Sequence, residues 1–414
     1  MANATITPQI ITRESLMLLE NEFVMTPTLS RAHRNDFKKI GNTLYVRKPV
    51  RFEARTGRSV TTAGGVQDVE EAWVPVSVLT QRHVAWKFNA VELTMTIEEY
   101  SDRYIKPAMS ALAHEVEYTC AGQYSKIYHS AGTPGTTPST TKSVGEMGVL
   151  LTDHGVPRRE RYAQLNPDAC LEISDQIRGV GSNVGYGPDD LSKTALQEAT
   201  IGRVGGFMTA ENAFINAHTT GSRTATGNTV DGATQETTYA LSKNTWTQTL
   251  DINTDTTTAT GHVLEGDVFT IAGVNSINPA TKESTGKLQQ FVVRADANAA
   301  TDTATLTISP PIIISGPYAT VDASPADTAA ITFLGAPDTE FPQNLGYQKG
   351  AFSFGMIPLI VPDAAVWGDS RSYKGLSLRV YKWLDGDEDE EYIRVDAHYF
   401  VEVVHHDMAT RLWG

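Results

Sequence analysis

The residues that could do chemistry lie in three short segments, and the first of them is rich in glycine. GVGSNVGYG, at 179–187, invites comparison with the G-x-G-x-x-G turn that holds pyrophosphate in dinucleotide-binding folds. Val184 stands where the third glycine is needed, and no parallel strand directly precedes the segment. The spacing therefore predicts a loop, and no nucleotide or other cofactor is expected.

The second segment, LDGDEDEEYIRVD, is strongly acidic and has the outline of a calcium loop. Asp385, Asp387 and Asp389 alternate along it as calcium ligands do. Glu390 stands where the sharp turn of that loop needs glycine, and Asp396 stands where a bidentate glutamate is expected. We therefore expect the acidic tip of a hairpin that faces solvent or a partner, rather than a metal site.

The third segment, HYFVEVVHHDM, carries His398, His405, His406 and Asp407. If it is a strand, positions 398 and 406 share one face and 405 lies on the other. Eight residues of strand span about 26 Å, which is too far for one metal ion. No Ser/His/Asp or Cys/His set appears at interpretable spacing elsewhere, so we do not expect an enzyme.

The composition limits the function further. The 414 residues are 40% hydrophobic and 20% charged, which is typical of a folded chain of two or three domains. A net charge of −14 argues against binding of duplex nucleic acid through the average surface. Cys120 and Cys170 lie in no metal or redox motif, and two reduced, buried thiols are preferred over a disulfide. Neither a signal peptide nor a membrane span is expected.

Several elements look unable to bury their own apolar faces. Residues 1–42 predict a short amphipathic helix, with Leu16, Leu19 and Phe23 on one face. Residues 43–95 read as a long two-stranded ribbon, which is marginal in water unless it lies on a surface. Its basic residues lie on the outgoing arm and its acidic residues on the return. We expect the ribbon to contact another chain.

The longest helical pattern follows the ribbon, in residues 96–132. Apolar residues recur there at intervals of three or four, and Pro107 marks either a kink or the first turn of the main helix. Helices are also expected from SVGEMGVLLTDHGV and DDLSKTALQEATIG, and a strand followed by a helix from RYAQLNPDACLEI. The chain is therefore α+β or α/β, and it ends in a hairpin.

The largest change in composition begins at residue 221. Between Thr224 and Thr260 there are 14 threonines in 37 residues, and the pattern to about residue 335 is strand and turn. Within it, LEGDVFTIAGVNSINPATKESTGKLQQFVVRAD predicts two strands, one from Val268 and one from Phe291, joined by a polar loop. The segment reads as an inserted all-β domain.

The order of these elements resembles that of the major capsid protein of tailed bacteriophages, with the Hong Kong 97-type fold. The segments TIGRVGGF, at 200–207, and GDVFTIAGV, at 266–274, are similar to those around and inside the inserted β-barrel domain of the P-twenty-two coat protein group. The resemblance implies the following parts: an N-arm (1–42), an E-loop ribbon (43–95), a spine helix (96–132), an A-domain in two pieces (133–220 and 336–374), the inserted domain (221–335) and a P-domain hairpin with the C-terminus (375–414).

The resemblance implies a non-enzymatic shell protein, and Hong Kong 97-type crosslinking residues have no match here. Its implied partners are copies of itself in hexamers and pentamers, a scaffolding protein, a portal protein and packaged double-stranded DNA that is held without sequence specificity. Assembly is expected in the host bacterial cytoplasm, with no membrane. We expect the contacts between subunits to pair arginines of the ribbon with acidic residues of a neighbour. The candidates are Arg51, Arg55 and Arg58, with Glu70, Glu71, Asp387, Asp389 and Glu391.

Two alternatives remain. The threonine-rich domain could bind glycans in a tail-associated or surface phage protein, which would predict sugar affinity and no shells. A hydrolase could be assembled from distant residues such as Asp153 and His154, although no pattern in the sequence supports it.

Overall fold

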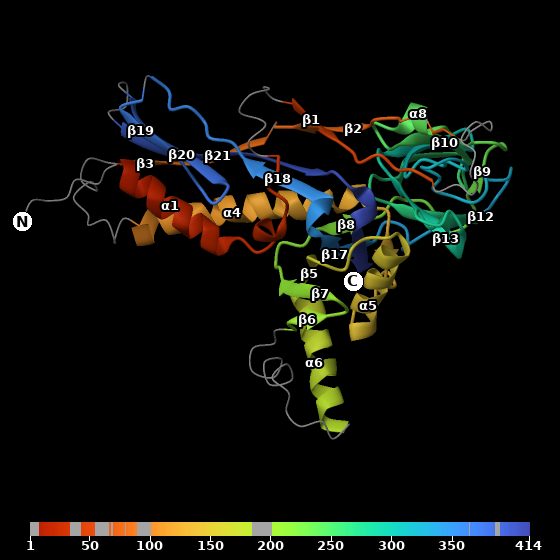
Figure 1. Cartoon of the computed structure of the whole chain (residues 1–414). Coiled ribbons are helices and arrows are strands. Elements are labelled where there is room, and N and C mark those ends of the chain that lie inside the picture. Colours follow the sequence, from red (N-terminus) through yellow and green to blue (C-terminus); the bar gives the residue numbers. More distant parts are fainter. Residues whose placement is uncertain are drawn as a thin grey trace, which may run out of the picture. The chain divides into compact units, whose positions relative to one another are not determined.

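The computed structural model describes residues 8–33, 43–53, 66–67, 69–78, 80–88, 101–183, 201–363, 365–385 and 390–414. The chain divides into two compact units, each made of separated segments. Unit one comprises Met1–Tyr45, Pro75–Cys120 and Phe352–Glu402, and unit two comprises Val46–Val74, Ala121–Ala351 and Val403–Gly414. Figure 1 shows both units and labels many of their helices and strands.

Unit one contains a five-stranded sheet in which β20 and β21 form the predicted hairpin, with Asp385 opposite Glu390. The strands are in the order β18-β21-β20-β19, and β3 pairs with β21. One face of the hairpin is buried because small and branched apolar residues alternate along it, as at Val380 and Val395. The strands are β3 (Thr80–Phe88), β18 (Phe352–Met356), β19 (Trp367–Tyr373), β20 (Leu376–Asp385) and β21 (Glu390–Val403).

Two helices also belong to unit one. Helix α1 (Pro8–Glu22) contacts β19 and β20 and buries Leu16 and Leu19, as its amphipathic pattern predicts. Helix α4 (Lys106–Ala121) follows a π-helical turn (Ser101–Ile105), and Pro107 lies in its first turn, where a missing N–H costs nothing. The predicted long helix therefore ends at Ala121 and continues only as a 3-10 turn, η4 (Gly122–Lys126).

Unit two holds a seven-stranded sheet in the order β4-β22-β17-β5-β7-β6, with β8 paired to β17. Helix α5 (Thr141–Asp153) and helix α6 (Pro167–Asn183) bury Val144, Met147 and Ile173 in the hydrophobic core that they share with this sheet. The strands are β4 (Ser130–Ala131), β5 (Arg161–Leu165), β6 (Arg203–Val204), β7 (Phe207–Glu211), β8 (Ala217–Thr219), β17 (Glu340–Gln348) and β22 (Ala409–Trp413).

Three sequence expectations need correction. Strand β22 pairs with β17 and β4, so the last strand is not part of the hairpin sheet with which residues 375–414 were grouped. Strands β18 and β19 lie in the hairpin's sheet, although they were assigned with 336–374. Helix α6 continues to Asn183, so the beginning of GVGSNVGYG is helical rather than a loop. Alternation of apolar residues identifies a strand, but not the sheet that it joins.

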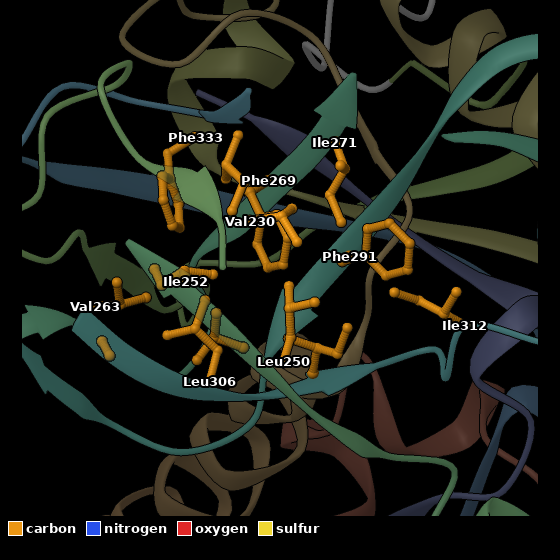
Figure 2. Close-up of a cluster of buried hydrophobic side chains, with 14 of the residues drawn as sticks. Val230, Leu250, Ile252, Val263, Phe269, Ile271, Phe291, Leu306, Ile312 and Phe333 are labelled. Carbon is orange, nitrogen blue, oxygen red and sulfur yellow. The ribbon is translucent and has the colours of Figure 1, made fainter. Parts of the chain in front are cut away.

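The threonine-rich segment folds as an eight-stranded sheet, with its main path in the order β11-β14-β15-β13-β12-β16. Strand β12 pairs with β13, and Phe269 stands opposite Phe291, which confirms the two strands predicted there. The two rings stack with their centroids 5.6 Å apart, and Figure 2 shows them in the buried core with side chains from the other strands. The strands are β9 (Thr229–Val230), β10 (Gln248–Asn253), β11 (Thr258–Val263), β12 (Val268–Ile277), β13 (Ser284–Val293), β14 (Ala297–Ala300), β15 (Thr303–Ser309) and β16 (Ile331–Phe333).

Helix α5 begins with an N-cap that offers a modest stability test. The Thr140 hydroxyl oxygen accepts from the Ser143 backbone N–H, one of the N–H groups without an intrahelical partner. Thr140→Ala is expected to lower the free energy of unfolding by about 1 kcal/mol in urea denaturation. Thr136→Ala, an exposed position outside the helix, is the control. Equal effects of the two substitutions would contradict the capping role.

Candidate assembly contacts

The base of the ribbon is a pair of short strands, β1 (Thr43–Arg47) and β2 (Trp73–Ser77). Burial alternates along both strands, and the Lys48 N–H continues the pairing by donating to the Ala72 carbonyl at 2.8 Å. The return arm of the predicted ribbon does not stay paired to the outgoing arm. Beyond β2 it becomes β3, which pairs with β21, so the two-stranded part is shorter than 43–95.

Within unit two, the ribbon base lies against the inserted domain of its own chain. The Lys48 Nζ lies 5.0 Å from the centre of the Trp246 ring. The Arg51 N–H donates to the Tyr318 hydroxyl at 3.0 Å, and Lys243 lies 3.7 Å from a Glu70 carboxylate oxygen. The surface that a long ribbon needs is therefore provided partly by the same subunit.

Arg51 also forms a short ion pair at this junction. Its Nη2 donates to Asp407 Oδ2 at 2.7 Å, and the Tyr128 hydroxyl donates to Asp407 Oδ1 at 2.7 Å. Burial acts to raise the pKa of Asp407, but the Arg51 charge and these two hydrogen bonds hold it below its usual range. Arg51 was expected to face a neighbouring subunit; in this chain its guanidinium is already paired, across 356 residues of sequence.

The other predicted contact residues fall into two groups. Glu71 lies 3.5 Å from Arg47 in an exposed pair on the ribbon, and Glu391 pairs with Lys382 on the hairpin. Exposed pairs of the first kind contribute little to stability, so Glu71 stays a candidate for contacts between subunits, whereas Glu70 lies beside Lys243 of the inserted domain. The remaining predicted residues lie outside the described residues: Arg55, Arg58, Asp387 and Asp389.

A buried charge cluster anchors the inserted domain, and sequence reasoning missed its role. Asp267 has no exposed surface, and its carboxylate accepts from His218 Nε2 at 3.1 Å and from Arg223 Nη2 at 3.2 Å. It also accepts from the backbone N–H groups of Gly221 and Leu264. Burial acts to raise the pKa of Asp267, but the His218 hydrogen bond and the Arg223 charge lower it overall. The GD pair of GDVFTIAGV was the available signal.

The same cluster ties both connections of the inserted domain to the seven-stranded sheet. Arg223 donates to the carbonyls of Leu334 and Gly335, where the chain leaves the domain. Arg411 of β22, which is fully buried, donates to the Gly266 carbonyl at 2.9 Å. The chain enters the domain at Gly221, where an added Cβ would lie 2.4 Å from the His262 carbonyl oxygen, so only glycine fits there. Within unit two, the inserted domain is therefore docked by hydrogen bonds rather than joined by free linkers.

In unit one, a buried carboxylate holds the segment after α1. Glu117 of α4 has no exposed surface and accepts from the backbone N–H groups of Met25 and Thr26, each at 2.9 Å. Its Oε1 also accepts from the Thr26 hydroxyl at 2.6 Å. Residues 26–28 form a 3-10 turn, η1 (Thr26–Thr28), and the Glu117 charge lies at its N-terminus, where negative charge is favourable.

The described residues give no support to the chemical alternatives. Strand β21 ends at Val403, so His405 and His406 do not continue it as the sequence had suggested. No group of three His, Cys, Asp or Glu side chains suited to a metal occurs among the described residues. Cys120 and Cys170 are both buried and free, as expected. In the described part of the chain, no helix is long and apolar enough to cross a membrane.

A family model matches the chain over its whole length. The family described as P22 coat protein, gene protein 5, matches residues 1–414. A major capsid protein of Acyrthosiphon pisum secondary endosymbiont phage 1 is 25% identical over 335 residues, which cover 77% of this chain and 73% of that protein.

Solved structures similar to this chain include one of Mycobacterium phage Che8, at 12% identity, with 94% of this chain and 90% of that chain covered and a TM-score of 0.46. Another is the CUS-3 coat protein I-domain, at 36% identity, with 27% of this chain and 96% of that chain covered and a TM-score of 0.20. The predicted function, a phage major capsid protein, is confirmed over the glycan-binding alternative. Because the family match extends from the first residue to the last, the chain belongs to the P22 coat protein family.

Proposed function

We propose that this chain forms the icosahedral shell of a tailed phage as hexamers and pentamers and encloses double-stranded DNA. The family match over residues 1–414 is the observation that carries the proposal. We infer a structural role without catalysis, since the candidate chemical motifs all depart from their patterns.

We propose that the parts of the chain take the roles of the Hong Kong 97-type fold. The N-arm and the inserted domain keep the boundaries given above, whereas the two-stranded ribbon base is β1 with β2, and the spine helix is α4 followed by η4. Strands β18 and β19 are assigned to the P-domain with the hairpin, and β22 to the A-domain with β17, because of their pairing. The inserted domain then acts as a device for folding and geometry.

Further partners follow from the same proposal. A scaffolding protein would guide assembly in the host cytoplasm, and a portal protein would replace one group of subunits. The net charge of −14 suits a container that encloses DNA without gripping it, because like charges repel.

The test of this proposal uses the two ribbon arginines that are still candidates for contacts between subunits. Arg55→Glu together with Arg58→Glu is expected to leave the subunit folded, because most charge reversals outside a buried core cost little stability. Assembly should be blocked or misdirected, because like charges at an interface oppose docking. Circular dichroism would report folding, and electron microscopy would report closed shells.

The matched control is Arg55→Lys together with Arg58→Lys, which keeps both charges and should assemble normally. Normal shells from the glutamate variant would remove these arginines from the interface. Failure of the lysine variant would show that the guanidinium geometry, rather than the charge, is required.

A further inference from the structure

A small pocket, of about 50 Å³, lies where the ribbon base meets the inserted domain, and all of its lining belongs to unit two. Tyr239 and Tyr318 stack in parallel with their ring centres 3.6 Å apart, and Trp246 packs edge-on against Tyr239. Two cations of the ribbon, Lys48 and Arg51, also line this cavity. The cavity is therefore a polar pocket with an aromatic wall.

The charges in this pocket do not balance. Asp407 is the carboxylate of the lining, and its two oxygens are already used by Arg51 and by the Tyr128 hydroxyl. The Lys48 ammonium lies over the Trp246 ring, and none of the residues that the structure describes forms a hydrogen bond or an ion pair with it. Among the described side chains, this cation of the pocket has no carboxylate as a direct partner.

The titration of Lys48 agrees with this geometry. Burial lowers its pKa to about 8, Asp407 opposes that shift, and the Arg51 charge adds to it. The other titratable side chains of the lining are Tyr239, Tyr318, His405 and His406. Among them, the pKa of His406 is lowered by its burial and by the Lys48 charge, so this imidazole is neutral and supplies no anion.

We propose that this pocket receives the carboxylate of an acidic side chain from a second copy of the chain, which pairs with the Lys48 ammonium. The proposal rests on the proposed function, since only assembly brings a second copy to the pocket. The chain carries 48 acidic against 34 basic residues, so a neighbouring copy offers many carboxylates. A lysine held over an aromatic ring keeps its donors available for such a partner.

A nucleic acid suits the pocket less well than a single carboxylate. A phosphate backbone carries closely spaced charges and is bound by rows of cations. The lining supplies only two cations from the ribbon, and Arg51 is already paired with Asp407. A single carboxylate from a protein side chain matches the one unpaired ammonium.

The closing experiment couples amines to nearby carboxylates with a water-soluble carbodiimide in assembled shells. The Lys48 amine forms an amide with a carboxylate, and the carbodiimide takes up the released water as its urea. Shells are assembled from a mixture of nitrogen-15-labelled and unlabelled chains, so that mass spectrometry separates links between chains from links within one chain. The proposal predicts an amide between chains at Lys48 in shells, which also identifies the partner residue, and none in the unassembled chain.

A pH profile distinguishes pairing of Lys48 from mere proximity. In the unassembled chain, the pKa of Lys48 is lower than in the unfolded chain, so its burial opposes folding below pH 8 and ceases to do so as the pH rises toward 10.5. Lys48→Met is therefore expected to raise the melting temperature by several degrees at pH 7, with the gain gone near pH 10. Lys48→Arg keeps its charge at pH 10, so this variant should not regain stability as the pH rises. In shells, the incoming carboxylate should pair with the ammonium. Lys48→Met is therefore expected to lower the melting temperature of the shells at pH 7, whereas it raises that of the unassembled chain.

The outcomes separate the two proposals. The proposed carboxylate pocket is supported if shells contain the interchain amide and if Lys48→Met lowers their melting temperature at pH 7. Shells without an interchain link at Lys48 overturn it, and so do shells whose melting temperature Lys48→Met raises, as in the unassembled chain. Either result leaves the shell function unaffected. A gain from Lys48→Met that does not change between pH 7 and 10 also overturns it, because the ammonium is then not desolvated. Absence of shells from the parent chain under every condition would overturn the proposed function itself.

Discussion

Asp267→Ala is expected to lower the free energy of unfolding of the unassembled chain by about 3–5 kcal/mol. The substitution removes the carboxylate that faces the fully buried guanidinium of Arg223. It also leaves His218 and two backbone N–H groups without their acceptor. A buried cation without a partner is costly because desolvation is no longer offset. Urea denaturation followed by tryptophan fluorescence would measure the change.

The control for this prediction is Asp296→Ala. Asp296 is exposed and accepts from the Glu265 backbone N–H, so its loss should cost under about 1 kcal/mol. Replacing both Asp267 by leucine and Arg223 by methionine should recover part of the stability, because no unpaired charge is then left inside. A cost below about 1 kcal/mol for Asp267→Ala would show that the cluster does not anchor the inserted domain.

The second large effect is expected at Glu117. Glu117→Ala removes the acceptor of two backbone N–H groups and one hydroxyl at a site with no exposed surface. The expected loss is about 3 kcal/mol in the free energy of unfolding, because unsatisfied buried donors cost about 1–3 kcal/mol each and the site relaxes partly. Hydrogen exchange should also show a local effect: the amides of Met25 and Thr26 should exchange faster in the variant than in the parent chain.

Glu115→Ala provides the comparison two positions earlier on the same helix. Glu115 makes an exposed ion pair with Arg82 at 2.7 Å, and such pairs contribute about 0–1 kcal/mol. If the two alanine variants lose equal stability and the amides after α1 keep their protection, then Glu117 does not hold this segment.

Elements that depend on local pattern could be predicted from the sequence. The hairpin of β20 and β21 and the pair of β12 and β13 follow from alternation and a polar turn between two strands. Helix α5 and the first turn of α4 follow from apolar spacing, with a capping threonine before α5 and a proline in the first turn of α4. These features depend on residues that are close together in the chain.

Contacts between distant residues could not be predicted in this way. Arg51 and Asp407 are separated by 356 residues, and the sequence around either residue does not predict their ion pair. Strand β22 pairs with β17 and β4, whereas the strands just before it in the sequence form the hairpin. Asp267 belongs to the motif GDVFTIAGV, but its role depends on Arg223 and His218, which contact it only in the folded domain.

The shell function is tested most directly by negative-stain electron microscopy of the purified, overexpressed chain, alone and with a candidate scaffolding protein from the same source. A member of the P22 coat protein family that builds a phage shell is expected to form closed or aberrant polyhedral particles. Monomers alone under every condition, with and without the candidate scaffolding protein, would contradict it.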